Sequence, residues 1–224
     1  MNSAPEIVES ILAECEALPA RNTPSLRAVR RKYTRLLRDA PGDRVVEIAR
    51  QLRQTGRYRW FGYELILAHP GAFQLLDASL LEELGQGLDS WWTTDAFART
   101  LSGPAWLRGQ APDGLILDWA GSPDRWWRRA ALVSTVALNM RSQGGHGDPP
   151  RTLRVCRILA GDHDDMVAKA LSWALRELVP HDPGAVQAFL DEHQAVLAAL
   201  VQREVQNKLR TGLKNPTRKR LESG

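Results

Sequence analysis

The sequence predicts an all-α fold, and two observations support that prediction. Apolar residues recur every three or four positions along almost all of the 224 residues, and no segment shows the alternating, β-branched pattern of a strand. The 13 prolines and 17 glycines fall mostly between these periodic segments and divide the chain into short helices. Many short helices in antiparallel pairs favour an α-solenoid over a single bundle.

The elements follow in order from periodicity and from helix start signals. Thr23 is the predicted N-cap of the second helix, with Pro24 in its first turn, and Asp43 is the predicted N-cap of the third. The helices are predicted over 6–18, 23–40, 43–54, from 57 onward, 75–84, from 89 through 97, near 106, and over 113–120, 125–140, 151–160, 163–179, 183–191 and 193–212.

The spacing of these helices also predicts the domain organisation. No tetratricopeptide or ankyrin consensus is visible, but helix pairs at a spacing of about 35–45 residues are typical of HEAT-like repeats, whose stacking makes a concave surface. We expect a single HEAT-like repeat domain over residues 1–212 and a basic, frayed tail over 213–224. Residues 142–150 are a predicted loop.

Composition narrows the class of protein. The net charge is +4 and the sequence pI about 9.4, a modest positive balance that suits a polyanionic partner if the arginines share one face. The two cysteines, Cys15 and Cys156, lie far apart, which favours a reducing cytosol, such as a bacterial cytosol or nucleoid, over a disulfide scaffold. We expect no membrane association, no signal peptide and a monomer.

Common catalytic motifs are absent from the sequence. It contains no GxxxxGK[ST] phosphate loop, no GxGxxG fingerprint, no HExxH pair and no GxSxG nucleophile elbow. The acidic run GDHDD at 161–165 is predicted to be a polar loop in which Asp162 or Asp164 caps the next helix, because an isolated cluster lacks further metal ligands.

Trp91 and Asp95 form the first candidate site. They are four residues apart, so on a helix they share one face, with about 5–6 Å between their Cβ atoms. The indole face attracts positive charge and the carboxylate adds a full negative charge, so the pair suits a cation. From this spacing alone, however, a buried tryptophan with an exposed aspartate one turn on is the commoner arrangement.

Two further segments favour a binding surface. Trp173 shares a helix face with Lys169 and another with Arg176, and the segment 125–129 interleaves three arginines with Trp126 and Trp127. Basic and aromatic side chains interleaved on three helices are typical of a surface on which cations hold phosphates while indoles meet a sugar or a base. The sequence therefore predicts a concave, basic DNA-binding face.

At these positions the chain resembles the HEAT-repeat DNA alkylation-repair glycosylases of the AlkD type, over roughly residues 23–209. The resemblance is carried by the helix start at Thr23, by Trp91-x-x-x-Asp95, by WRRAA at 127–131 and by KALSWALRE at 169–177. It implies that Asp95 is the catalytic carboxylate and that Trp91 and Trp173 are the two indoles of the cleft. It also implies backbone contacts to DNA from Arg129, Arg128, Lys169 and Arg176. Trp92 leaves a one-position shift of the match open, and the spacing to Asp95 favours Trp91.

The resemblance implies a reaction as well. The family excises cationic N3- and N7-alkylated purines from double-stranded DNA by hydrolysis, without flipping the base and without a metal or an organic cofactor. Some relatives are specialised for bulky adducts or are inactive. Two other interpretations stay open: a non-catalytic HEAT-repeat scaffold that binds distorted or branched DNA, and a protein-binding adaptor, which gives no reason to place an aspartate between two indoles.

Overall fold

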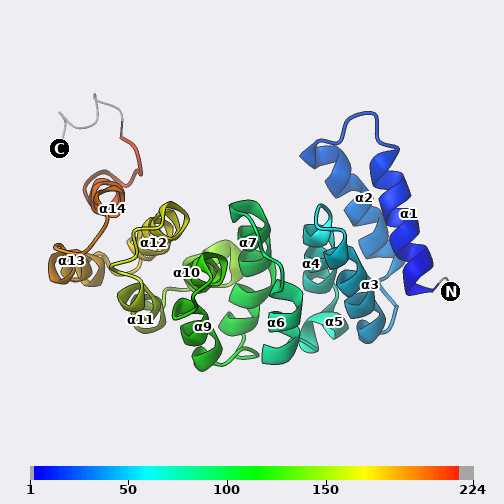
Figure 1. Cartoon of the computed structure of the whole chain (residues 1–224), viewed down its shortest axis with the longest axis horizontal. Helices are drawn as coiled ribbons and strands as arrows, with labels where there is room; N and C mark the ends of the chain where they lie inside the picture. Colours follow the sequence, from blue (N-terminus) through cyan, green and yellow to red (C-terminus); the bar gives the residue numbers. More distant parts are fainter. Residues whose placement is uncertain (1–2, 217–224) are drawn as a thin grey trace. The chain divides into compact units, whose positions relative to one another are not determined.

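The computed structural model describes residues 3–216, and every regular element in this part of the chain is a helix (Figure 1). The all-α, HEAT-like solenoid class is therefore confirmed. The helices form two compact units, an N-terminal unit up to Gln86 and a C-terminal unit from Gly87 onward. The single domain over 1–212 stays a prediction, and most of the predicted frayed tail, 217–224, lies outside the described residues.

The N-terminal unit is built from six helical segments. They are α1 (Ala4–Glu16), α2 (Thr23–Leu36), α3 (Gly42–Gln54), α4 (Arg59–Ala68), α5 (Pro70–Gln74) and α6 (Ala78–Gly85). Within this unit α3 packs most extensively against α4, and α1, α5 and α6 also pack on α3. Gly62 permits the close approach of α3 and α4, because a Cβ there would lie 2.8 Å from the Cα of Ala49.

Two predicted helix starts are wrong in detail. Asn22, not Thr23, is the N-cap of α2, and its side chain accepts a hydrogen bond from the amide of Ser25. Thr23 is instead the first helical residue, so the predicted N-cap is one residue too late. Asp43 lies in the first turn of α3 after Pro41, and its acidic side chain suits that turn without capping it.

The C-terminal unit holds every candidate site residue. Its segments are α7 (Trp91–Phe97), η1 (Ala98–Ser102), α8 (Gly103–Leu107), α9 (Asp113–Ala120), α10 (Arg125–Asn139), η2 (Arg141–Gln143), α11 (Pro149–Ile158), α12 (Asp165–Leu178), α13 (Pro183–Glu192) and α14 (Ala199–Thr211). Here η1 is a π-helical segment and η2 a short 3-10 helix. The predicted helix over 193–212 begins only at Ala199.

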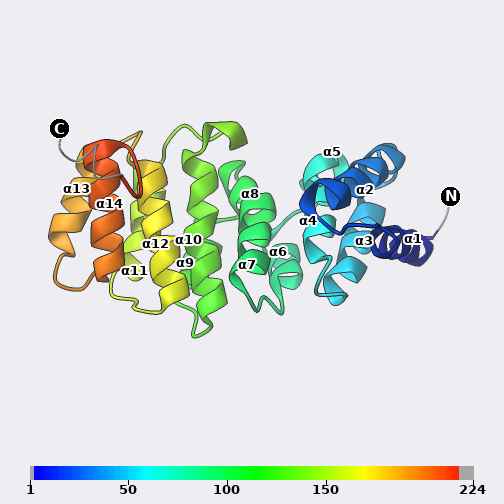
Figure 2. The ribbon, with the colours of Figure 1, turned by 90° about the horizontal axis from the view of Figure 1, so that it is seen from above.

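The helices of this unit form two rows. The row α7, α10, α12 and α14 is linked by contacts between consecutive members, and α9, α11 and α13 pack against it as the second row. Figure 2 shows α10, α12 and α14 side by side. The candidate residues Asp95, Arg129 and Trp173 come from three members of the first row, so the packing of the row sets their mutual positions.

The helical segment that carries Asp95 is fixed to α10 at its far end. Gly103 begins α8, and a Cβ at this position would lie 2.9 Å from the Cβ of Ala137 and 2.9 Å from the carbonyl oxygen of Ser134. Beside it, the buried hydroxyls of Ser102 and Ser134 share a hydrogen bond of 2.7 Å. The lack of a side chain at Gly103 permits α8 to approach α10 closely, and the hydrogen bond stabilises the contact of η1 with α10.

No helix within residues 3–216 combines the length and the apolar character that crossing a bilayer requires.

Candidate functional site

Helix α7 begins with two exposed indoles, and one turn later it carries a largely buried carboxylate. Trp91 is 57% exposed and Trp92 39% exposed, whereas the Asp95 side chain is only 16% exposed. Thr94 and Phe97 of the same helix are fully buried and orient α7. This is the reverse of the commoner arrangement, in which the tryptophan is buried and the aspartate exposed.

Asp95 is clamped by Arg129 of α10. The guanidinium donates from Nε to Oδ1 and from Nη2 to Oδ2 of the carboxylate, both at 2.8 Å. The Arg129 side chain is only 7% exposed, and its remaining Nη1 donates to the carbonyl oxygen of Met166 in α12. A bidentate pair of this kind fixes the plane of the carboxylate, so one arginine ties three helices together around Asp95.

Opposing influences act on the ionisation of Asp95. Burial raises the pKa of the carboxyl above its ordinary value. The hydrogen bonds and charge of Arg129, and the charge of Arg99, lower the pKa but do not cancel the rise. Each carboxylate oxygen keeps a further lone pair beyond the one that accepts from Arg129. The carboxylate can therefore still face a second positive charge.

The first turn of α10 positions Arg129. Asp124 caps the helix and accepts from the amide of Trp126 at 2.8 Å. Trp127, one turn from the cap, packs its ring 4.7 Å from that of Trp119 and edge-on to Phe97. This aromatic group joins α7, α9 and α10, and it explains Trp127 as a packing residue rather than a binding residue.

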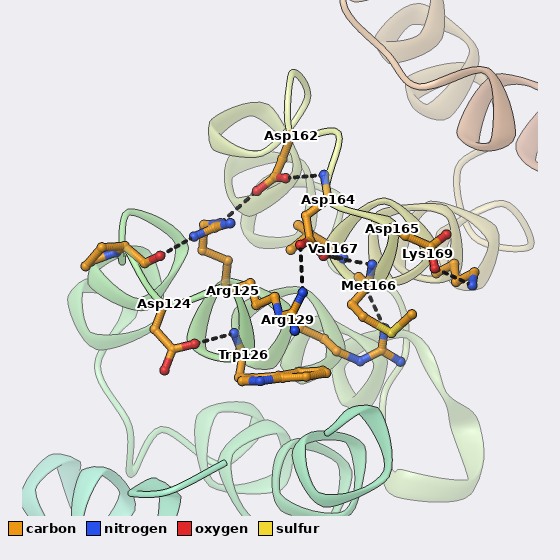
Figure 3. Close-up of polar contacts among 12 residues, drawn as sticks. Asp124, Arg125, Trp126, Arg129, Asp162, Asp164, Asp165, Met166, Val167 and Lys169 are labelled. Atoms are coloured by element: carbon orange, nitrogen blue, oxygen red, sulfur yellow. Dashed lines mark hydrogen bonds and ion pairs between the residues drawn. The ribbon is translucent and has the colours of Figure 1, made fainter. Parts of the chain in front are cut away.

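The start of α12 is organised by the acidic run, as Figure 3 shows. Asp164 caps α12 and accepts from the amides of Met166 and Val167 at 2.9 and 3.4 Å. Arg125 of α10 lies 3.3 Å from the same carboxylate. The prediction that Asp162 or Asp164 caps this helix is confirmed with Asp164. The cap places the carbonyl of Met166 where Arg129 reaches it.

Trp173 lies two turns further along α12 and is half-buried. Its indole Nε1 donates to the carboxylate of Glu177 at 3.0 Å, one turn on in the same helix. The guanidinium of Arg99, from η1, lies over the ring with its carbon 5.5 Å from the ring centroid. The positive charge of Arg99 also lowers the pKa of Asp95. Arg99 therefore links Trp173 to the pair of Asp95 and Arg129, and the four residues form one group. Trp91 belongs to it through its position one turn before Asp95.

The predicted backbone contacts differ in their surroundings. Arg128 donates to Asp162 at 2.7 Å and to the carbonyls of residues 122 and 123. Arg176 donates to the hydroxyl of Ser172, which in turn donates to the buried Glu204 of α14 at 2.6 Å. Lys169, by contrast, is exposed, and within residues 3–216 it pairs only with the exposed Asp165 of its own helix. Its ammonium is therefore the most accessible of the three cations.

Two participants were not predicted from the sequence. Glu177 lies in the segment 169–177, and its spacing of four residues from Trp173 is a sequence signal for an indole–carboxylate hydrogen bond. Arg99 also lies four residues from Asp95, but its contact with Trp173 is tertiary and has no sequence signal. Within residues 3–216 no three histidine, cysteine or acidic side chains gather as a metal site would require.

Comparison with known proteins assigns the chain to a family. Residues 8–209 match the family model described as DNA alkylation repair enzyme. The match spans the whole candidate site and both units. No match was found among the curated proteins, and none among the solved structures.

Proposed function

Because the chain belongs to the DNA alkylation repair enzyme family, we propose that it is a DNA glycosylase. Its substrate is duplex DNA that carries cationic N3- or N7-alkylated purines, and it hydrolyses the N-glycosidic bond of the damaged nucleotide without flipping the base. The observation that carries this proposal is the largely buried Asp95 carboxylate, which Arg129 orients one helical turn after the exposed indole of Trp91.

The charges of the site suit the substrate. Alkylation at N3 or N7 makes the purine cationic, and the faces of Trp91 and Trp173 attract a cation by about 0.5–2 kcal/mol each. The carboxylate of Asp95 adds a full negative charge in partly buried surroundings, where electrostatic interactions are stronger than in bulk water.

The reaction needs only water as co-reactant. The bond between C1′ and the purine nitrogen breaks, and its electron pair neutralises the purine. The sugar passes through an oxocarbenium-like state, whose positive charge Asp95 stabilises. Asp95 also orients a water whose oxygen bonds to C1′ as it loses a proton. The products are a neutral free base, an abasic site and the proton from the water, which passes to solvent.

The cationic residues of the site have different roles in this proposal. Arg129 is a positioning residue, because all three of its guanidinium nitrogens are engaged by Asp95 and Met166. Lys169 is the best placed of the predicted cations to contact a phosphate. Arg128 and Arg176 would contact the DNA backbone only after leaving the partners that now hold them. The basic concave face expected of the solenoid completes the proposed DNA-binding surface.

One assay tests the proposal. The full chain is incubated with a duplex that carries a single 7-methylguanine, and both the free base and the alkali-labile abasic sites are measured over time. Stoichiometric release of base with matching strand breaks supports a glycosylase. Salt-sensitive binding without release would identify a non-catalytic DNA-binding scaffold. Neither binding nor release would favour a protein-binding adaptor.

The choice between small and bulky lesions is tested in the same way. A duplex with a large N7 adduct replaces the methylated one, and the two release rates are compared. A site that contacts the sugar and the backbone rather than enclosing the base predicts release of both.

A further inference from the structure

Arg99 is a cation that the catalytic proposal does not use. It is the second residue of η1, four positions after Asp95, and its side chain is exposed. Its guanidinium carbon lies 5.5 Å from the centroid of the Trp173 ring. Across residues 3–216 it forms no salt bridge within 4.0 Å. In the free protein, its guanidinium therefore contacts an indole face, while its charge acts on Asp95 from a longer distance.

The ring that Arg99 covers is held from another direction. The Nε1 of Trp173 donates to Glu177 at 3.0 Å, and this contact lies within α12, so it does not depend on Arg99. A carboxylate at the ring edge makes the indole a better partner for a cation. Trp173 therefore presents a fixed, cation-attracting face whether or not Arg99 is in place.

The backbone of Arg99 is also fixed. It lies in a π-helical segment, a geometry often found at functional sites. Its carbonyl accepts from Nε2 of Gln143, in the segment after α10, at 3.2 Å. The hydroxyl pair of Ser102 and Ser134 anchors the segment three residues on. The long Arg99 side chain can therefore leave the indole while the backbone of η1 keeps these contacts.

We propose that Arg99 is a built-in competitor for the cation site on Trp173. Its guanidinium covers the indole in the free protein and is displaced by the positive charge of an alkylated purine. Two cations cannot share one ring face, because they repel each other at that distance. A neutral nucleotide gains nothing from the face and leaves Arg99 where it is. This proposal rests on the proposed function, and it makes Arg99 a specificity-determining residue.

The exchange also fits the charge balance of the reaction. The purine is cationic before the glycosidic bond breaks and neutral afterward, so it holds the indole face only as substrate. Once the base is neutral, Arg99 returns to Trp173. The preference of the protein for a cationic over a neutral nucleotide is then the difference between two cation–π contacts, that of the lesion and that of Arg99.

Removal of Arg99 should therefore raise the preference for cationic lesions. The two probes are matched duplexes, one with cationic 7-methylguanine and one with neutral 7-deaza-7-methylguanine, both on a 2′-fluoroarabinose sugar that resists cleavage. The ratio of their dissociation constants cancels any contact of Arg99 with phosphate. An exposed cation–π contact predicts that Arg99→Ala raises this ratio about two- to fivefold over wild type. Arg99→Lys, which keeps the charge but stacks less well, should give an intermediate ratio.

Two comparisons make the result specific. Arg141→Ala removes another exposed arginine of the same unit and should leave the ratio at the wild-type value. In a Trp173→Leu background, Arg99→Ala should no longer raise the ratio, because no ring remains to compete for. Thermal unfolding of each variant shows whether the fold is kept.

Several outcomes would overturn the proposal. An unchanged or lowered ratio in Arg99→Ala would show that Arg99 does not compete with the lesion. The same rise with Leu at position 173 would assign the effect to repulsion through space. In either case, a wild type that still releases 7-methylguanine would leave the proposed function standing. A wild type with no release and no preference for the cationic duplex would contradict both.

Discussion

Asp95 must be ionised and must also lie close to a developing positive charge, and both conditions depend on Arg129. The two hydrogen bonds of 2.8 Å hold the carboxylate in one orientation and offset part of the cost of burying it. The same contact reduces the net negative charge of the site. Arg129 therefore fixes the orientation of Asp95 but weakens its attraction for a positive charge. This arrangement suits a site in which the orientation of the reacting groups limits the rate.

The Asp95–Arg129 pair should be strongly coupled in stability. Arg129→Leu leaves a buried carboxylate without its partner, and Asp95→Ala leaves a buried guanidinium, so each should lower the free energy of unfolding by up to about 3–5 kcal/mol. The double variant should cost less than the sum of the two single ones. Denaturant unfolding of all four proteins measures the coupling, and strict additivity would show that the pair is not energetically linked.

The raised pKa of Asp95 predicts an acid limb in the excision rate. An acid whose pKa is raised by folding takes up its proton at a higher pH than usual, so the ionised form needed for catalysis is lost as pH falls through that pKa. Single-turnover rates at saturating protein should therefore decline at a pH above about 4, the ordinary value for aspartate. The uncatalysed release at each pH is subtracted. A rate that stays flat to pH 4 would contradict the assignment of Asp95.

At this scale the sequence predicted which residues share a helix face, but not how they are buried. The spacing of Trp91 and Asp95 predicted a shared helix face, and the composition of 125–129 predicted a basic segment. Burial of Asp95 was not predictable, because it depends on how far α10 delivers Arg129 across to α7. Spacing also cannot tell that Trp127 packs against Trp119 while Trp91 stays exposed, since both depend on tertiary contacts.

The consecutive segments α7, η1 and α8 form one helical arm that packs on α10, and this arm carries Asp95 and Arg99. Its far end is fixed where Gly103 meets Ala137 and Ser134. Helix ends were the least predictable feature in the sequence: α5 was missed because it has only 5 residues, and the π-helical turn of η1 has no apolar period of its own. The longer amphipathic helices were predicted correctly because each buries one continuous stripe.

A side chain at Gly103 should separate this arm from α10. Gly103→Ala places a Cβ 2.9 Å from the backbone oxygen of Ser134, so the arm must shift, and we expect a loss of about 1–3 kcal/mol in unfolding free energy together with slower excision. Gly114→Ala is the matched control, since that helical glycine has no heavy atom within 4 Å of the added Cβ. It should be neutral or stabilising by up to about 1 kcal/mol. Equal effects at both positions would contradict a positional role for the arm.

The whole molecule contains 30 lysines and arginines and 26 acidic residues, so its net charge of +4 reflects a small excess of cations. Composition predicted this excess but not which cations are free. The structure shows that several arginines near the site are held by acidic partners, as Arg128 is by Asp162. DNA binding should depend on the cations that are not held in this way.

The salt dependence of DNA binding distinguishes these two kinds of cation. Binding to an undamaged duplex should weaken as salt rises, with a logarithmic slope of about 0.9 for each phosphate contacted. Lys169→Gln should lower the slope by about one contact. Arg128→Gln should leave the slope unchanged and lower the stability instead, because it breaks an internal pair. A lower slope in Arg128→Gln with no change in Lys169→Gln would reverse this assignment.

The central claim is that Asp95 acts on the sugar of an alkylated nucleotide, and the most direct test compares wild type with Asp95→Asn. Single-turnover release of 7-methylguanine from duplex DNA is measured at protein concentrations that saturate binding for both proteins. The removal of a charge aimed at the transition state predicts a fall of about 10²-fold or more in the release rate, with DNA binding retained and the fold intact by thermal unfolding. Release by Asp95→Asn at a rate within a fewfold of wild type would contradict the claim.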